Sequence, residues 1–210
     1  MFLCDQPPNP SPYNSPHHDS LSHLVSPRAM LTRSFIIVSL GLYHAFLSLT
    51  YPSPPQSLCP NPSHLAPYLF TWTPHSAIAI ITILLGSCIR LWAFSTLGKN
   101  FTFRLDAPKE LITSGQYKYV QHPSYTGRIL IALSAVALLM RPDASLGCWF
   151  PAWVVDATIF WRLMLGLMLV GLVRGTRKRV MEEESILKDT FGKEWEDWHK
   201  RTKRFIPGVF

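Results

Sequence analysis

Two short stretches of the chain carry the residue types that chemistry needs. The first, Gly115–Gly127, reads GQYKYVQHPSYTG and lies between apolar segments. It contains two glycines, a His-Pro step, three tyrosines and a lysine, which is not the composition of a lipid-facing helix. The second is the acidic cluster Glu182–Glu184, which follows the last apolar segment. Any reaction carried out by this chain is therefore expected at these two stretches.

The backbone of the first stretch is expected to be irregular. Gly115 and Gly127 permit tight turns or a close approach of another backbone. Pro123 disfavours a helical conformation at His122, so the chain should be extended there. Irregular backbone at membrane depth is tolerated only where protein or a water-filled cavity covers it, so this stretch would suit a flat, polar cofactor. The alternative is an interfacial loop anchored in the membrane by its three tyrosines, Tyr117, Tyr119 and Tyr125.

The second stretch belongs to a helix expected over Arg177–Lys188. Arg179 and Glu183 are four residues apart and therefore share one face of that helix. On this reading Glu182 and Glu184 point elsewhere. The alternative is a solvated surface pair worth about 0.3–0.5 kcal/mol. The position of the helix, directly after an apolar run, favours a functional site.

Composition indicates an integral membrane protein. The 210 residues are 48% hydrophobic and only 16% charged, against about 25% charged in typical soluble domains. The net charge is +7, and the basic residues lie between apolar runs, which suits a membrane surface better than nucleic acid. No nucleic-acid partner is therefore expected. The four cysteines form no Cys-x-x-Cys pair, so no metal site is expected either.

The fold class expected is an all-α integral membrane protein. Four apolar runs predict about four transmembrane helices, over about 34–51, 73–97, 125–140 and 153–173. Residues 1–30, rich in Pro, Ser and His, predict a disordered tail, and 31–210 a single membrane domain. Its C-terminal region, 174–210, is expected to complete a cofactor pocket. Gly192 should separate a helix ending at about Thr190 from a second helix over about Glu194–Lys203.

The basic residues predict the orientation. Most of the 20 Lys and Arg residues fall in the N-terminal tail, in 98–124 and in 174–210. With four spans these segments share one side, which the positive-inside rule makes cytosolic. Arg90 and Arg162 lie within spans. Arg90 can snorkel to an interface. Arg162, inside the fourth span, either is a functional residue or snorkels toward the lumenal end, and snorkelling is favoured. Cys59 and Cys148 fall on the lumenal side and could pair there, although two free thiols are the simpler expectation.

The two stretches together resemble a known family. LITSGQYKYVQHPSYTG, followed after a membrane hairpin by RKRVMEEESILKDTFGKEWEDWHKRTKRFIPGVF, is similar to the isoprenylcysteine carboxyl methyltransferase family over roughly Leu97–Phe210. The features that carry the resemblance are G-x-Y with H-P-S-Y-x-G, and R-x-x-x-E with F-G-x-E-[WY]. The resemblance implies a multi-pass enzyme of the endoplasmic reticulum membrane with its active site facing the cytosol. Such an enzyme uses S-adenosylmethionine to methylate the C-terminal carboxylate of prenylated CaaX-type protein termini.

The resemblance also implies roles for individual residues. The cofactor-binding residues that it implies are Leu111, Gly115, Tyr117, Tyr119, His122, Pro123, Tyr125, Gly127 and Glu183. Arg179 and Glu183 are implied as catalytic, and Arg179 and Arg201 as substrate-binding. Gln116 and Gln121 stand where the family often has proline and arginine, and these departures bear on the substrate more than on the cofactor.

The chemistry expected of these residues is positioning. A carboxylate is already ionised at pH 7, so its methylation needs no general base. Arg179 can hold it by two parallel hydrogen bonds, while Glu183 can orient Arg179 or accept the cofactor's amino group. The prenyl chain would enter sideways from the membrane lipid. The alternatives are a phospholipid or other lipid N-methyltransferase, in which His122 or Glu183 would act as base, a membrane reductase using a nicotinamide cofactor, and a non-enzymatic scaffold.

Overall fold

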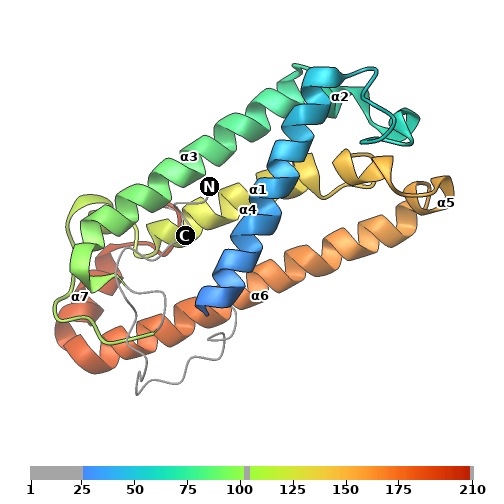
Figure 1. Ribbon diagram of the computed structural model, residues 1–210. Helices are drawn as coiled ribbons and strands as arrows, with labels where there is room; N and C mark the ends of the chain where they lie inside the picture. Colours follow the sequence, from blue (N-terminus) through green and yellow to red (C-terminus); the bar gives the residue numbers. More distant parts are fainter. Residues whose placement is uncertain (1–25, 102–104, 209–210) are drawn as a thin grey trace. The chain divides into compact units, whose positions relative to one another are not determined.

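The described part of the chain is mostly helical. The computed structural model describes residues 26–101 and 105–208 (Figure 1). Its α-helices are α1 (Pro27–Thr50), α2 (Pro67–Phe70), α3 (Pro74–Leu97), α4 (Pro123–Leu139), α5 (Ala152–Val155), α6 (Thr158–Phe191) and α7 (Lys193–Arg201). Short 3-10 helices are η2 (Pro62–His64), η3 (Gly98–Asn100), η4 (Gly115–Lys118) and η5 (Ser145–Cys148). Within the described residues there is no β-strand, so the prediction of an all-α fold is confirmed.

Three of the helices, α1, α3 and α6, are long and apolar enough to cross a membrane, and α4 is a shorter apolar helix of 17 residues. They correspond to the four predicted runs. α1 begins at Pro27 rather than at residue 34, so Pro27–Met30 is helical although a disordered tail was expected there. The rest of that predicted tail, residues 1–25, lies outside the described residues. α4 begins at Pro123, because proline suits the first helical position, where no N–H is needed.

The last span and the charged helix after it form one continuous helix, α6, of 34 residues. At ~1.5 Å per residue it is about 51 Å long, more than a bilayer core of ~30 Å requires. Its apolar part ends at about Val173, and the remainder, from Arg174, carries nine charged side chains. α6 stops before Gly192, where φ is 52°, and α7 follows. The predicted break at Gly192 is confirmed.

The chain divides into two compact units. The first unit contains the described parts of residues 1–32, 86–129 and 172–210, and the second contains 33–85 and 130–171. Helices α1, α3, α4 and α6 contribute residues to both units. The single domain expected over 31–210 stays a prediction.

In the second unit, a disulfide joins Cys59 to Cys148, and both cysteines are fully buried. The expectation of two free thiols is therefore wrong, and the alternative, a disulfide between Cys59 and Cys148, is confirmed. The reason is a close contact between distant segments: the backbone N–H of Asn61 donates to the Cys148 carbonyl at 3.2 Å, and its side-chain amide does so at 3.1 Å. The disulfide is part of an apolar core that also includes Leu47, Leu69, Phe70, Ala79 and Leu138.

The core of the first unit is aromatic. It consists of the buried residues Ala93, Tyr117, Trp195 and Trp198, with Leu97, Leu111, Ile112, Leu187 and Phe191 partly buried against them. Helices α3 and α4 approach closely at Gly127, where an added Cβ would lie 2.5 Å from the carbonyl oxygen of Gly86. The close approach expected at Gly127 is present, and it holds the start of α4 against α3.

Arg90 also joins α3 to the start of α4. Arg90 is only 5% exposed, and its guanidinium donates to the carbonyl and the hydroxyl of Ser124, at 3.0 and 3.2 Å. It also lies 5.0 Å from the centre of the Phe94 ring. The expectation that Arg90 snorkels to an interface is therefore wrong, because Ser124 supplies the acceptors that water would otherwise provide. Arg162, in the second turn of α6, is exposed.

Candidate active site

The first stretch is not helical at Val120–His122 and pairs there with the segment Thr202–Phe205, here called the C-terminal segment. The N–H of Gln121 donates to the Lys203 carbonyl at 2.8 Å, and that of His122 donates to the Arg204 carbonyl at 2.9 Å. His122 is not helical, as Pro123 predicted, and the extended conformation expected there stays a prediction. The irregular region is shorter than expected, because Pro123–Gly127 is already the first turn of α4.

The side chain of Gln121 strengthens this pairing. It is 4% exposed, and its amide nitrogen donates to the carbonyls of Thr202 and His199, at 2.9 and 3.1 Å. Its oxygen accepts from His199 Nδ1 at 2.8 Å. Gln116 is buried as well and donates to the Ile89 carbonyl at 3.3 Å. Gln116 and Gln121, which depart from the family pattern, therefore each connect two segments of the first unit by hydrogen bonds.

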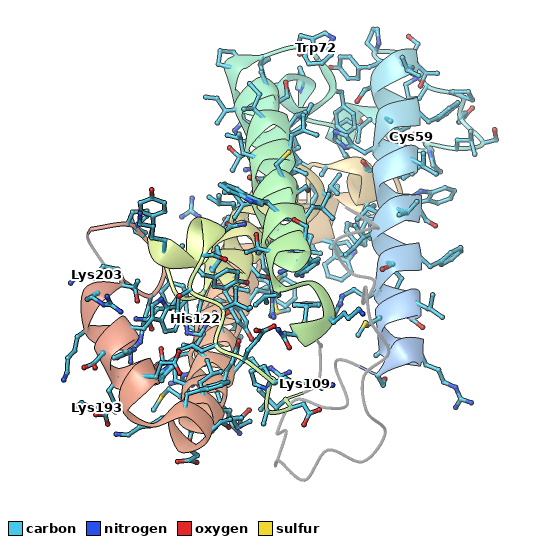
Figure 2. The ribbon with its side chains drawn as sticks, turned by 90° about the vertical axis from the view of Figure 1, so that its left-hand side faces the viewer. Cys59, Trp72, Lys109, His122, Lys193 and Lys203 are labelled. Atoms are coloured by element: carbon cyan, nitrogen blue, oxygen red, sulfur yellow. A yellow bond between two sulfur atoms is a disulfide. The ribbon has the colours of Figure 1, made fainter. Side chains whose placement is uncertain are left out.

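His122 lies between two carboxylates of α6. Its Nε2 is 3.2 Å from Glu184 Oε1, and its Nδ1 is 3.9 Å from Glu183 Oε2. Figure 2 shows His122 in the interior of the first unit, while Lys193 and Lys203 lie at the edge of that unit. His122 is only 4% exposed. The expectation that Glu184 points away from the site is wrong. One imidazole nitrogen faces Glu184 and the other faces Glu183, because the ring packs against α6 where these two consecutive residues lie.

Glu184 is the most strongly bound acid of this group. Arg204 donates to its two oxygens, from Nε to Oε1 and from NH2 to Oε2, at 2.8 Å each. Burial alone would raise the pKa of Glu184, but the hydrogen bonds and charges of His122 and Arg204 outweigh it and lower the pKa to about 2. Glu184 lies in the charged part of α6, beyond its apolar part. It therefore remains a carboxylate and holds His122 and Arg204 in place.

Arg179 and Glu183 meet the tyrosines of the first stretch. Arg179 is 7% exposed and donates a hydrogen bond to the Tyr125 hydroxyl. Glu183, one turn later, has a side chain that is 37% exposed. Burial raises the pKa of Tyr117 well above its ordinary value, and the nearby charge of Glu183 raises it further. The structure thus brings the two predicted stretches together within the first unit.

The remaining predicted residues divide into two groups. Leu111 packs against the aromatic core, and Gly115 takes a positive φ of 59° with Thr96 beside it. Tyr119 and Arg201 are both exposed. Tyr119 contacts the amine of its neighbour Lys118, and Arg201 donates to the Asp197 carbonyl of its own helix at 3.1 Å. These two side chains are not brought to Arg179. Tyr117 is only 6% exposed, so it does not act as the membrane anchor that the alternative interpretation of this stretch expected.

Sequence reasoning missed Glu184 and Arg204 as parts of this arrangement. The run of three glutamates made Glu184 a candidate for the site. However, Glu184 is five residues from Arg179, so helical periodicity assigned it to another face of the helix. Arg204 is 20 residues from Glu184 and lies beyond α7. No periodic pattern relates such residues, so only the folded chain brings them together.

Comparison with known proteins identifies the family. The model of the isoprenylcysteine carboxyl methyltransferase (ICMT) family matches residues 78–189, which is more than half of the chain. The chain is 30% identical to the protein-S-isoprenylcysteine O-methyltransferase of Rattus norvegicus over 143 residues, covering 66% of this chain and 43% of that protein. The protein of the same name from Dictyostelium discoideum is 28% identical over 136 residues, covering 63% and 49%.

The Arabidopsis thaliana protein-S-isoprenylcysteine O-methyltransferase B is 25% identical over 138 residues, covering 64% of this chain and 60% of that protein. The chain spans about half the length of the curated relatives it matches. The family match includes Arg179, Glu183 and the whole of Gly115–Gly127. The protein thus belongs to the isoprenylcysteine carboxyl methyltransferase family.

Proposed function

We propose that this protein transfers a methyl group from S-adenosylmethionine to the C-terminal carboxylate of a prenylated cysteine. The observation that carries the proposal is the burial of Arg179, whose guanidinium bonds to the Tyr125 hydroxyl, which the charge of Glu183 also reaches. A buried guanidinium with a planar fork of donors is suited to a carboxylate, which it can bind through two parallel hydrogen bonds. Family membership supports the methyl-transfer reaction.

The residues of the first unit fit S-adenosylmethionine as the methyl donor. Thr176 Oγ1 and Trp195 Nε1 are buried and have no hydrogen-bond partner in the described part of the chain, although nearly all buried polar groups have one. The donor carries amino, carboxylate, hydroxyl and ring-nitrogen groups that can pair with such atoms. Leu111 and Tyr117 offer an apolar surface to its adenine. When bound, the donor supplies a methyl group on a positively charged sulfur.

The roles of the chain's own residues follow from their positions. Arg179 binds and orients the substrate carboxylate, which is ionised at pH 7 and needs no base. Glu183, partly exposed and near Tyr117, would hold the amino group of the methyl donor. His122 is engaged by Glu184, and Glu184 by Arg204.

The substrates and location that we propose are those of a membrane enzyme. Prenylated CaaX-type protein termini would reach the site with the prenyl chain in the membrane lipid. The distribution of Lys and Arg supports an active site facing the cytosol. The Cys59–Cys148 disulfide joins the connections that would then face the oxidising lumen. These features together support a multi-pass protein of the endoplasmic reticulum membrane.

The experiment is a methyl-transfer assay on membranes from cells that express the chain, with S-adenosylmethionine labelled in its methyl group. The acceptors are N-acetyl-S-farnesylcysteine, phosphatidylethanolamine and a sterol. We expect label on the farnesylcysteine that is released by mild base, because a methyl ester is base-labile and an N-methyl group is not. The carboxamide of the same farnesylcysteine is the matched control, since it lacks the accepting carboxylate. Absence of base-labile label on the farnesylcysteine would overturn the proposal.

A further inference from the structure

Helix α7 carries two buried tryptophans whose indole N–H groups differ. Trp198 is 5% exposed and donates from Nε1 to the Tyr117 carbonyl at 3.0 Å. Trp195, one turn earlier, is 6% exposed, and its Nε1 has no hydrogen-bond partner among residues 26–101 and 105–208. An indole nitrogen can only donate, and a buried donor without an acceptor is unfavourable. A bound ligand with an acceptor atom would therefore remove this unfavourable state by accepting a hydrogen bond from the N–H of Trp195.

The surroundings of Trp195 define what such a ligand must look like. Its ring belongs to the aromatic core with Tyr117, and Leu111 packs against the same core. It also stacks on His199, with ring centres 4.4 Å apart and planes at 24°. His199 is in turn bonded to Gln121 at 2.8 Å. An apolar, aromatic environment with a single fixed donor suits a flat heterocycle that has an acceptor nitrogen in its ring.

We propose that the indole N–H of Trp195 donates a hydrogen bond to a ring nitrogen of the adenine of S-adenosylmethionine. This inference rests on the proposed function, because it names how this chain would hold the same methyl donor. The adenine is favoured over the donor's carboxylate because the core residues packed with Trp195 are aromatic and aliphatic, and an apolar core disfavours the burial of a charge. Leu111 and Tyr117, implied as cofactor-binding residues, lie against that core.

The test compares two matched variants of the full chain in detergent, Trp195→Phe and Trp198→Phe. Each keeps an aromatic ring and removes one indole N–H. Binding of S-adenosylhomocysteine is measured by calorimetry, and the unfolding temperature is measured without ligand. We expect Trp195→Phe to weaken binding about tenfold. Both variants lose the same ring volume from the core, so we expect Trp195→Phe to lower the unfolding temperature less than Trp198→Phe does. We expect Trp198→Phe to lower the unfolding temperature, because it leaves the Tyr117 carbonyl without its donor.

A second measurement changes the ligand instead of the protein. The 1-deaza, 3-deaza and 7-deaza analogues of S-adenosylhomocysteine each lack one ring nitrogen. The analogue that lacks the accepting nitrogen should bind the unsubstituted protein about tenfold more weakly than S-adenosylhomocysteine does. To Trp195→Phe, which lacks the indole N–H, this analogue and S-adenosylhomocysteine should bind with equal affinity. Unchanged affinity in Trp195→Phe, or equal losses for every analogue in both proteins, would overturn the inference. Failure of the unsubstituted protein to bind S-adenosylhomocysteine would overturn the proposed function as well.

Discussion

Arg204 binds both carboxylate oxygens of Glu184, with its Nε 2.8 Å from Oε1 and its NH2 2.8 Å from Oε2. The same Oε1 is 3.2 Å from Nε2 of His122. The C-terminal segment is thereby attached to the charged part of α6 and to the residue that precedes α4. Because His122 also pairs its backbone with Arg204, side chains and backbone hold the same three parts of the first unit together.

Replacing Arg204 by alanine should destabilise the protein. Glu184 is buried, so it would lose two charged hydrogen bonds while keeping the contact with His122. Arg204 is 44% exposed in its side chain, so water would compensate in part, and we expect a loss of about 1–2 kcal/mol. The unfolding temperature in detergent measures it. Arg201→Ala is the control, because Arg201 is exposed. Equal unfolding temperatures for the two variants would contradict the role assigned to Arg204.

The pKa of Glu184 predicts how stability depends on pH. In the folded protein this pKa is lowered to about 2 from 4.5. A group with a lowered folded-state pKa contributes stability that is present above the unfolded-state pKa and is lost as the pH falls toward the folded-state value. Stability should therefore decline as the pH falls from about 4.5 to about 2. Glu184→Gln should show a smaller decline in unfolding temperature over that range, and parallel curves for both proteins would refute the assignment.

Replacing Arg179 by alanine should abolish methyl transfer while the protein still enters the membrane. Two charged hydrogen bonds worth ~3 kcal/mol together correspond to a loss of activity of about 100-fold or more. Arg179→Lys should recover only part of the activity, because lysine cannot form the planar bidentate pair. Arg177→Ala, which removes an exposed arginine of the same helix, is the matched control. Activity of Arg179→Ala equal to that of the control would remove this arginine from the reaction.

Replacing Gly127 by alanine should separate α3 from α4. An added Cβ would lie 2.5 Å from the Gly86 carbonyl oxygen and 2.8 Å from Arg90 Cγ. Because one neighbour is backbone, we expect destabilisation of about 1–3 kcal/mol. Gly166→Ala in α6 is the control, since nothing lies within 4 Å of its added Cβ among the described residues. The difference in unfolding temperature between the two variants measures the effect, and no difference would mean that the helices can move apart freely.

Local features of this protein could be predicted from the sequence. The membrane helices follow from apolar runs, because the hydropathy of a segment decides whether it can cross a bilayer. The non-helical backbone at His122 follows from Pro123, whose ring restricts the preceding residue. The break at Gly192 follows from the freedom of glycine to take positive φ. Each of these features depends on residues that are neighbours in the chain.

The tertiary structure alone decided which polar side chains are buried together. Arg90 binds Ser124 within the first unit instead of reaching an interface. Cys59 and Cys148, 89 residues apart, form a disulfide. Glu184 is held by His122, 62 residues away, and by Arg204. Sequence periodicity places a side chain on a face of its helix, but the partner that packs on that face comes from elsewhere in the chain and depends on the whole fold.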